Sequence, residues 1–423
     1  MTTVRFLAEN ARPLSAGTML SYGSSYGQTF FIAIFAPQVM AATGLTHGGW
    51  GLVYLVATTT SALLMVWAGG LADRVRIGPL AALCTMGLAL ACLGMAAATG
   101  IAALGMAVLA LRFFGQGMMS HVAAVAMARW FAAGRGRALA IASVGFAIGQ
   151  AALPVVFVAL LEVAHWRALW VVAALTTALL VPLLLWAARG ERAPRETASD
   201  ASARGMDGRH WRRGEALRDP VLWLVLPMVL GPGAWGTALF FHQAHIAEAK
   251  GFGLAALVAL FPLYVGASLV STLVSGAALD RFGAARLLPL LAVPMAVGFA
   301  LMGAAEGLWA TGLALGILGI GWGAQATLPP AFWAEAYGTA HLGAIKALAG
   351  AAMVLGSALG PGLTGWLIDR GTDFPAQMVW YAGYFALAGL LTWRATTRAG
   401  RRMAPRTGAD ASVSGAEPRP AEP

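Results

Sequence analysis

The stretch Gly69-Gly70-Leu71-Ala72-Asp73-Arg74 closes a long apolar run, and Gly276-Ala277-Ala278-Leu279-Asp280-Arg281 repeats the pattern 207 residues later. Each copy has a glycine, then three residues, then an Asp-Arg pair. In a lipid-embedded helix such a glycine lets a neighbouring helix approach closely, and the charged pair emerges at the water interface, where it can cap or pair with helix ends. For a single copy, the alternative is a pair that only ends a membrane segment. Two copies indicate a chain built from two similar halves.

The composition places the chain in a membrane. Its 423 residues are 59% hydrophobic and only 11% charged, which excludes an ordinary soluble domain. The apolar runs are long and nearly continuous, whereas membrane strands alternate over about 10 residues, so a β-barrel is excluded as well. The sequence therefore predicts an all-α protein with many membrane-spanning helices.

Hydrophobic runs bounded by Gly, Pro, Trp and charged residues predict twelve spans of roughly 20 residues or more. The predicted spans lie near residues 14–43, 49–71, 79–99, 101–128, 138–162, 166–188, 220–244, 254–279, 287–305, 307–334, 342–368 and 376–394. They define an N-terminal six-helix bundle (1–188) and a C-terminal six-helix bundle (220–394). Residues 189–219 contain eight arginines and six acidic residues and predict a solvated linker, and residues 395–423 predict a disordered tail.

The distribution of basic residues predicts the orientation. With both termini and the linker in the cytoplasm, only Arg167, Lys250 and Arg370 fall in loops on the opposite side, and Arg112 lies inside a span. This asymmetry obeys the positive-inside rule. Since the arginines concentrate in connecting segments rather than on one face, the net charge of +10 does not indicate nucleic-acid binding.

The two Asp-Arg loops, the twelve spans and the central basic linker together resemble the major facilitator superfamily. The first loop is similar to the family's Gly-x-x-x-Asp-Arg-x-Gly-Arg loop at Gly69, Asp73 and Arg74, with Arg76 in place of the later glycine. The second loop matches at Gly276, Asp280 and Arg281, and also has a glycine at the later position. The resemblance implies two six-helix bundles around a midplane cavity that opens alternately to each side. A site between two repeats can be exposed to one side at a time when the repeats move as rigid bodies, which agrees with this arrangement. The candidate gating residues are those of the two loops: Gly69, Asp73, Arg74, Gly276, Asp280 and Arg281.

Arg112 is the clearest charge near the middle of a span. Because a charge at that depth costs a few kcal/mol, its side chain should face the bundle interior, a water-filled cavity or an anionic ligand. Gln116 lies four residues further on, on the same helical face. The stretch resembles the Arg-containing fourth-helix motif of proton-linked family members, with its Gln-Gly displaced by one position. The alternative role for Arg112 is to bind backbone carbonyls and hold two helices together.

Other polar residues expected at mid-depth are candidates to line a cavity with Arg112. Each has the alternative of a simple hydrogen bond between helices. Tyr22, Tyr26 and Thr29 are spaced to share one face of the first span. The full set is Tyr22, Tyr26, Gln28, Gln150, Tyr264, Ser268 and Gln325.

A buried arginine without a carboxylate predicted at mid-membrane makes the cavity electropositive and favours a small organic anion, of the monocarboxylate type. Monocarboxylate and oxalate carriers of the superfamily typically have a basic residue in the eighth helix, and here there is none before Arg281. One alternative is proton-linked efflux of apolar compounds, but Gly145-x-x-x-Gly149-Gln150 departs from the Gly-Pro pattern of drug antiporters. A second alternative is a non-transporting receptor or scaffold. The spacing Gly356-x-x-x-Gly360 is interpreted as helix packing.

No nucleotide-binding loop, metal-ligand spacing or paired nucleophile and base occurs in the sequence, so we expect no cofactor, no metal and no enzymatic activity. The expected partners are a small-molecule substrate and the lipid bilayer, without nucleic acid. We expect a monomer in the inner (plasma) membrane of a bacterium.

The predicted orientation can be tested by cysteine labelling. In a background without Cys84 and Cys92, single cysteines at Ala133 and Ser202 should react only with reagents that reach the cytoplasm, because both positions lie in predicted cytoplasmic segments. Intact cells and inverted vesicles treated with an impermeant maleimide provide the comparison. Labelling of either position from outside intact cells would reverse the predicted orientation.

Overall fold

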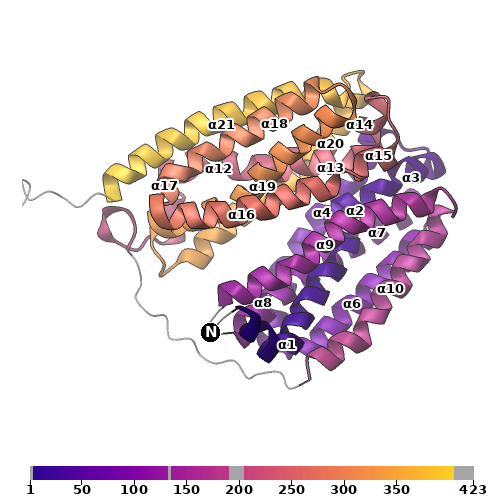
Figure 1. Cartoon of the computed structure of the whole chain (residues 1–423), viewed down its shortest axis with the longest axis horizontal. Helices are drawn as coiled ribbons and strands as arrows, with labels where there is room; N and C mark the ends of the chain where they lie inside the picture. Colours follow the sequence, from indigo (N-terminus) through magenta and orange to yellow (C-terminus); the bar gives the residue numbers. More distant parts are fainter. Residues whose placement is uncertain (1–2, 132–134, 190–203, 404–423) are drawn as a thin grey trace, which may run out of the picture.

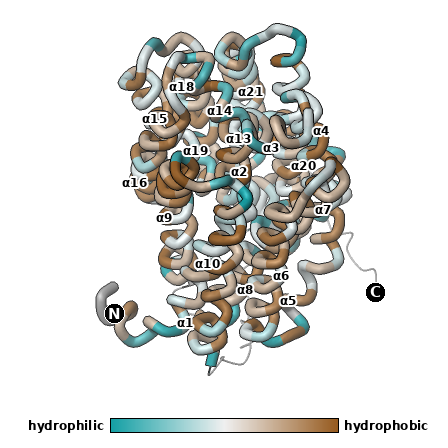
Figure 2. The backbone as a smooth tube through the Cα atoms, turned by 90° about the vertical axis from the view of Figure 1, so that its right-hand side faces the viewer, coloured by the Kyte–Doolittle hydropathy of each residue, from teal (hydrophilic) through white to brown (hydrophobic). Residues whose placement is uncertain are grey.

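The computed structural model describes residues 3–131, 135–189 and 204–403, and every regular element in these residues is helical (Figure 1). This confirms the predicted all-α class. Ten helical stretches of the described residues are long and apolar enough to cross a membrane. In Figure 2 the helices are largely hydrophobic, and many hydrophilic segments lie at their ends.

The N-terminal half (residues 3–189) begins with an interrupted first span and continues with longer helices. Its elements are α1 (Thr3–Ser24), η1 (Ser25–Gly27), α2 (Thr29–Ile32), η2 (Ala33–Phe35), α3 (Ala36–Thr43), α4 (His47–Ala68), α5 (Leu71–Arg74), α6 (Ile77–Ala97), α7 (Ile101–Leu111), η3 (Arg112–Met119), α8 (Ser120–Trp130), α9 (Arg135–Leu161) and α10 (Trp166–Ala187).

The C-terminal half (residues 204–403) has a comparable set of elements. They are η4 (Met206–Gly208), α11 (Arg213–Ala216), α12 (Pro220–Gly231), η5 (Pro232–Gly236), α13 (Thr237–Phe241), α14 (Gln243–Ala249), α15 (Leu254–Val258), α16 (Phe261–Phe282), α17 (Ala284–Leu287), η6 (Leu288–Leu291), α18 (Ala292–Ala304), α19 (Gly307–Tyr337), α20 (Leu342–Asp369) and α21 (Phe374–Met403).

Two predicted spans are not among the ten. The first, 14–43, is divided because the chain leaves the helix at Gln28, whose backbone is extended at φ −87° and ψ 155°. The last, 376–394, lies within α21, which carries Gln377 and two tyrosines, Tyr381 and Tyr384, in its apolar part. The first span is therefore helical in separate pieces, whereas residues 376–394 lie within one continuous helix.

The helix α21 continues to Met403, so the predicted tail begins later than residue 395; residues 404–423 lie outside the described part. The extension is held by Arg402, which donates to Asp207 at 2.6 Å and to Asp219 at 2.6 Å. These carboxylates raise the pKa of Arg402. Asp219 also caps α12 by accepting from the Val221 N–H at 2.8 Å. The described end of the predicted linker is therefore docked on the C-terminal half.

Glycines set the closest helix contacts within each half. In α9, a Cβ atom on Gly145 would overlap the Thr18 carbonyl of α1, and one on Gly149 would overlap the Ser25 hydroxyl. In α20, a Cβ on Gly356 would lie 2.6 Å from Leu230 O, and one on Gly360 would overlap the Ala234 carbonyl. The helices therefore meet backbone to backbone, which confirms the packing interpretation of Gly356 and Gly360.

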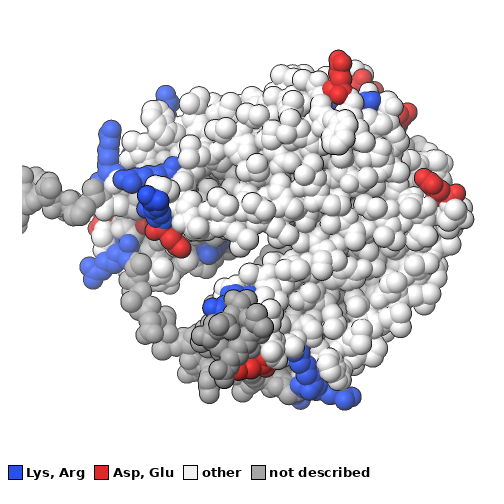
Figure 3. Space-filling model, in the orientation of Figure 1, with Lys and Arg blue, Asp and Glu red and all other residues white. Residues whose placement is uncertain are grey.

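The two halves touch at one end and separate at the other. At the closed end, defined by the loops around residues 44–46, 251–253 and 370–373, α4 packs along α20, and α9 contacts α15 and α16. A Cβ on Gly51 of α4 would lie 2.8 Å from Gly362 Cα of α20. The opposite end, where α1 begins and α21 ends, is here called the linker end. Figure 3 shows a cleft between the halves at this end, with the larger groups of Lys and Arg around it.

The glycine contacts predict the effect of adding one methyl group. Gly360→Ala should destabilise the protein by about 1–3 kcal/mol, because the new Cβ overlaps backbone that cannot move alone. Gly350→Ala is the matched control on the same helix, since nothing lies within 4 Å of its added Cβ. Thermal unfolding in detergent should show a lower midpoint for the first variant only. Equal midpoints for both variants would contradict this account of the contact between α20 and η5.

Candidate functional site

Arg112 begins a wide helical turn inside the N-terminal half. The α-helix α7 ends at Leu111, and the next eight residues, η3, form a π-helix before α8 resumes the α-helical form. Such turns occur frequently at functional sites. The Arg112 side chain is only 1% exposed, so it faces the protein interior.

The guanidinium of Arg112 is enclosed but poorly satisfied. Its Nη1 donates to Gly27 O at 3.4 Å and to Thr29 Oγ1 at 3.3 Å, both beyond the usual range of about 2.7–3.2 Å. Its Cζ lies 5.1 Å from the centre of the Tyr54 ring, and the Tyr54 hydroxyl is 2.5 Å from Thr29 Oγ1. Among the described residues, neither Nε nor Nη2 has a hydrogen-bond partner.

The break in the first span places these partners. A Cβ on Gly115 of η3 would lie 2.6 Å from Gly27 Cα, so the two backbones cross at a pair of glycines. At this crossing the chain turns through η1, becomes extended at Gln28 and restarts as α2 at Thr29. Because the helix is interrupted, the Gly27 carbonyl and the Thr29 hydroxyl are free to face Arg112.

The same break makes one prediction wrong. Tyr22, Tyr26 and Thr29 do not share a helical face, because the chain is not α-helical between residues 25 and 28. Tyr26 instead packs edge-on to Phe31 at 5.0 Å, and Thr176 donates to its hydroxyl at 3.0 Å. Tyr22 lies beside Tyr26, with their ring centres 6.3 Å apart. Only Thr29 of the three reaches Arg112.

Among the described residues, the three predicted glutamines of this half form no hydrogen bond with Arg112. Gln28 is the N-cap of α2, and its carbonyl accepts from Ile32 N at 3.1 Å. Gln116 and Gln150 are half-buried in η3 and α9. No hydrogen bond joins Gln116 or Gln150 to Arg112 in the described part of the chain.

The C-terminal half contributes a second group of unsatisfied polar atoms. Tyr264 of α16 is 1% exposed, with its ring 5.2 Å from Phe240 and 6.3 Å from Trp322. Its hydroxyl and the Oε1 atom of Gln325 are buried without a partner among the described groups. The Ser268 carbonyl accepts from Thr272 Oγ1 at 2.9 Å within α16, and a Cβ on Gly323 of α19 would overlap the same carbonyl.

An aromatic contact that was not predicted from the sequence joins the surroundings of Arg112 to the C-terminal half. Tyr54 of α4 lies 4.7 Å from Phe241 of α13, and Trp50 stacks on the same ring at 5.6 Å. Gln243 of α14 donates to Phe30 O at 3.0 Å. Trp50 and Tyr54 are four residues apart in the sequence, which is the only signal that could have indicated their shared face. Arg112 therefore lies beneath a contact between the two halves.

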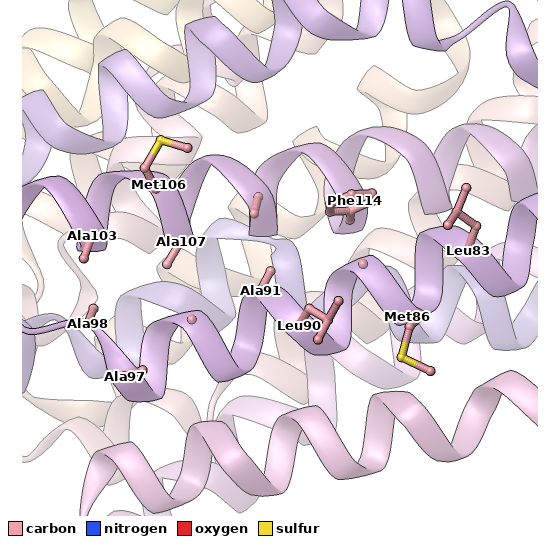
Figure 4. Close-up of a pocket in the computed structure, with 13 residues that line it drawn as sticks. Leu83, Met86, Leu90, Ala91, Ala97, Ala98, Ala103, Met106, Ala107 and Phe114 are labelled. Carbon is pink, nitrogen blue, oxygen red and sulfur yellow. The ribbon is translucent and has the colours of Figure 1, made fainter.

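An apolar groove lies elsewhere and does not suit a polar ligand. It has a volume of about 590 Å³ and runs along α6 and α7 (Figure 4). Leu83, Leu90 and Met106 line it and are 60–65% exposed. All of its lining side chains are apolar, so in a membrane this groove faces acyl chains.

The first Asp-Arg loop is anchored to α8 by its backbone. Arg129 donates to Ala72 O at 2.6 Å and to Val75 O at 3.3 Å. A ring nitrogen of His121 lies 3.0 Å from the Gly69 carbonyl. Arg74 is exposed, and the Asp73 side chain lies outside the described part.

The second loop is anchored by a residue of opposite charge. Glu335, at the end of α19, accepts from Ala284 N at 2.7 Å and Ala285 N at 3.2 Å, and thus caps α17. Asp280 and Arg281 are exposed, and Arg281 lies 5.3 Å from the Phe282 ring. The expected close helix contact at Gly276 is wrong for this conformation, because no described atom of a neighbouring helix lies within 4 Å of a Cβ placed there.

Three comparisons place this geometry among known proteins. A sequence model of the Major Facilitator Superfamily matches residues 18–276. A bacterial homologue of the human lysosomal transporter Spinster, described as inward-facing and unoccupied, has a TM-score of 0.67 at 15% identity, covering 94% of this chain and 99% of that one. The nucleoside transporter NupG has a TM-score of 0.68 at 14% identity, covering 90% of this chain and 98% of that one. No curated protein sequence gives a significant match.

The Glu335 contacts predict a local change in backbone dynamics. Glu335→Gln should speed hydrogen exchange at Ala284 and Ala285 about tenfold or more, because bonds to a charged acceptor contribute about 1.5–3 kcal/mol. Glu306→Gln is the control. It removes the same charge at the N-cap of α19, where the Glu306 side chain makes no capping hydrogen bond. Hydrogen exchange followed by mass spectrometry of peptides spanning residues 280–290 measures the effect. Unchanged exchange in Glu335→Gln would show that the cap does not hold this loop.

Proposed function

Because the chain belongs to the Major Facilitator Superfamily, we propose that it carries a small organic anion of the monocarboxylate type across the membrane by alternating access. The chain is a multi-pass membrane protein with the fold of this family, whose members are transporters rather than enzymes. The likeness to NupG supports the fold alone, since the identity is 14%.

The unsatisfied guanidinium of Arg112 is the observation that carries the choice of substrate. Burying an arginine at mid-membrane costs about 2.5–3.5 kcal/mol on insertion scales, and protein groups offset this poorly when two nitrogens lack partners. A carboxylate satisfies both nitrogens in one planar, bidentate contact. No Asp or Glu is seen among the bonds or ion pairs of Arg112 in the described residues, so its charge remains available to an anion.

Access to Arg112 is coupled to the movement of the halves. The side chain that covers the guanidinium, Tyr54, packs on Phe241 of the opposite half. Opening the closed end would separate these rings and uncover Arg112, whereas the present contact keeps it enclosed. A site beneath a contact between repeats is thereby exposed to one side at a time.

The remaining parts of the proposal follow the sequence analysis. Twelve spans form bundles 1–188 and 220–394, with both termini in the cytoplasm of a bacterium, and the transporter acts as a monomer. Arg112 anchors the anion, while Thr29 and Tyr54 are added here as its neighbours. The other proposed cavity residues are Gln116, Tyr22, Tyr26, Gln28, Gln150, Tyr264 and Gln325. The proposed gating residues are Gly69, Asp73, Arg74, Gly276, Asp280 and Arg281.

Substitution of Arg112 tests the substrate class. A thermal-shift screen of short mono- and dicarboxylates, nucleosides and neutral apolar compounds first identifies a ligand, since ligands that bind the folded state stabilise it. Arg112→Gln should then weaken anion binding by about 30-fold or more, because it removes the charged partner of a buried contact. Arg112→Lys should retain partial binding and uptake in proteoliposomes, since the charge remains without the planar geometry.

Arg398→Gln is the matched control, because Arg398 is an exposed arginine near the end of α21. It should bind and transport like the parent. A folded Arg112→Gln protein with parental anion affinity would leave Arg112 only the role of holding helices together. Stabilisation by apolar compounds alone would favour the efflux alternative.

A further inference from the structure

Three histidines meet at the closed end, across the boundary between the halves. His47 begins α4 in the N-terminal half, while His242 directly precedes α14 and His245 lies in its first turn, in the C-terminal half. The ring centre of His47 lies 4.9 Å from that of His245 and 5.9 Å from that of His242. His242 is 2% exposed, and its Nε2 lies 2.9 Å from Pro361 O in α20. These residues are called the histidine cluster below.

Three carboxylates lie near the histidine cluster, on Asp369, Asp373 and Glu248. Asp369, at the end of α20, accepts from the backbone N–H groups of His47 at 3.1 Å and Gly48 at 2.8 Å. Asp373 Oδ1 lies 3.9 Å from His245 Nε2, and Glu248 is three residues further along α14. The nearby cations face elsewhere: Lys250 donates to Ala305 O at 2.8 Å, and Arg370 stacks on the Trp366 ring at 3.9 Å.

A pocket gives the cluster access from the closed end. It has a volume of about 420 Å³, and His47, His245, Gln38 and Glu248 are among its lining residues. The Gln38 Oε1 atom is buried without a partner among the described groups. Water and protons entering this pocket reach two of the three imidazoles.

We propose that His47, His242 and His245 form a proton-binding site that controls the opening of the closed end. The inference deepens the proposed function, on which it rests, by naming the proton as a ligand that changes the balance between the two states of the transporter. No carboxylate at mid-membrane is required for this role.

The physical reason is the difference in proton affinity between the two states. In the closed state, burial and then the neighbouring His47 lower the pKa of His245, while Asp373 and Glu248 oppose this shift only partly. Separation of the halves would return the His245 imidazole to water, where the ordinary pKa is about 6.5. The open state therefore binds protons more tightly. The closed state is favoured above about pH 7 and becomes less populated as the pH falls through about 6.5.

The cluster is placed where a small displacement would open the contact between the halves. His242 contacts α20 through the Pro361 carbonyl. Asp369, at the end of α20, binds the first backbone N–H group of α4. These are the helices that cross at Gly51 and Gly362. Two imidazolium ions about 5 Å apart would repel each other across this crossing, in surroundings less polar than water. Protonation would thus act directly on the contact that keeps the end closed.

Distance measurements across the closed end test the proposal without a transported substrate. Spin labels at Ala42 and Ala255, in a Cys84→Ala, Cys92→Ala background, report on α3 and α15 by pulsed electron resonance in nanodiscs. In the parent, the ratio of long to short distances should rise at least about fivefold between pH 8 and pH 5. The His47→Asn, His245→Asn double variant should lose this rise. His165→Asn, an exposed histidine that also lies at the start of a helix, should retain it.

A second variant avoids any disturbance of the buried rings. Asp373 has a side chain that is 73% exposed, so Asp373→Asn should fold normally. Removing this carboxylate makes the imidazolium less stable in the closed state, so the acid-induced rise should become about two- to threefold larger at low salt. A parental pH response in the folded double variant, an absent response in the parent, or no increase in Asp373→Asn would each overturn the proposal.

The outcomes separate this inference from the proposed function. A pH response that depends on the histidines, in a protein whose Arg112→Gln variant still binds anions, would retain the proton site and reject the anion site. Loss of anion binding in Arg112→Gln, together with a pH response that survives in the double variant, would do the reverse.

Discussion

Backbone-to-backbone packing at glycines is the constraint on which the rest of this structure depends. In lipid, apolar side chains gain little by touching each other, so helices associate where small residues allow close approach. Gly145 and Gly149 seat α9 on α1, and Gly356 and Gly360 seat α20 on α12 and η5. The same kind of contact joins the halves at Gly51 and Gly362. Because such glycine contacts contain few polar bonds, the two halves can separate at one end without breaking either bundle.

Close packing also creates the candidate site. The crossing of Gly27 and Gly115 interrupts the first span and turns a carbonyl and a hydroxyl toward Arg112. These two acceptors are too distant to satisfy a guanidinium, and two of its nitrogens remain unpaired among the described residues. The protein therefore keeps a positive charge in an apolar region at a real energetic cost. That cost is reasonable if an anion removes it during part of the transport cycle.

The two ends of the molecule use different chemistry. At the linker end, Arg129 and Glu335 hold the two repeated loops through backbone groups, one by donating and the other by accepting. These contacts stay within each half and leave the cleft open. At the closed end, histidines and carboxylates of opposite halves meet directly, so the protonation of a few side chains bears on the contact itself. The closed end is consequently the one whose stability should depend on pH.

The sequence by itself determined the all-α membrane class, the repeated loops, the family resemblance and the inward-facing position of Arg112, because hydropathy and local spacing carry this information. Most predicted span positions agree with helices of the structure for the same reason. The tertiary structure decided which polar residues meet. The break at Gln28 turned Tyr26 away from Arg112, and Tyr54, whose partner Phe241 lies in the other half, was missed. His47 and Asp369 are 322 residues apart, and no local pattern records such a contact. Contacts between distant helices depend on how each helix is rotated and where glycines permit crossing, which hydropathy does not specify.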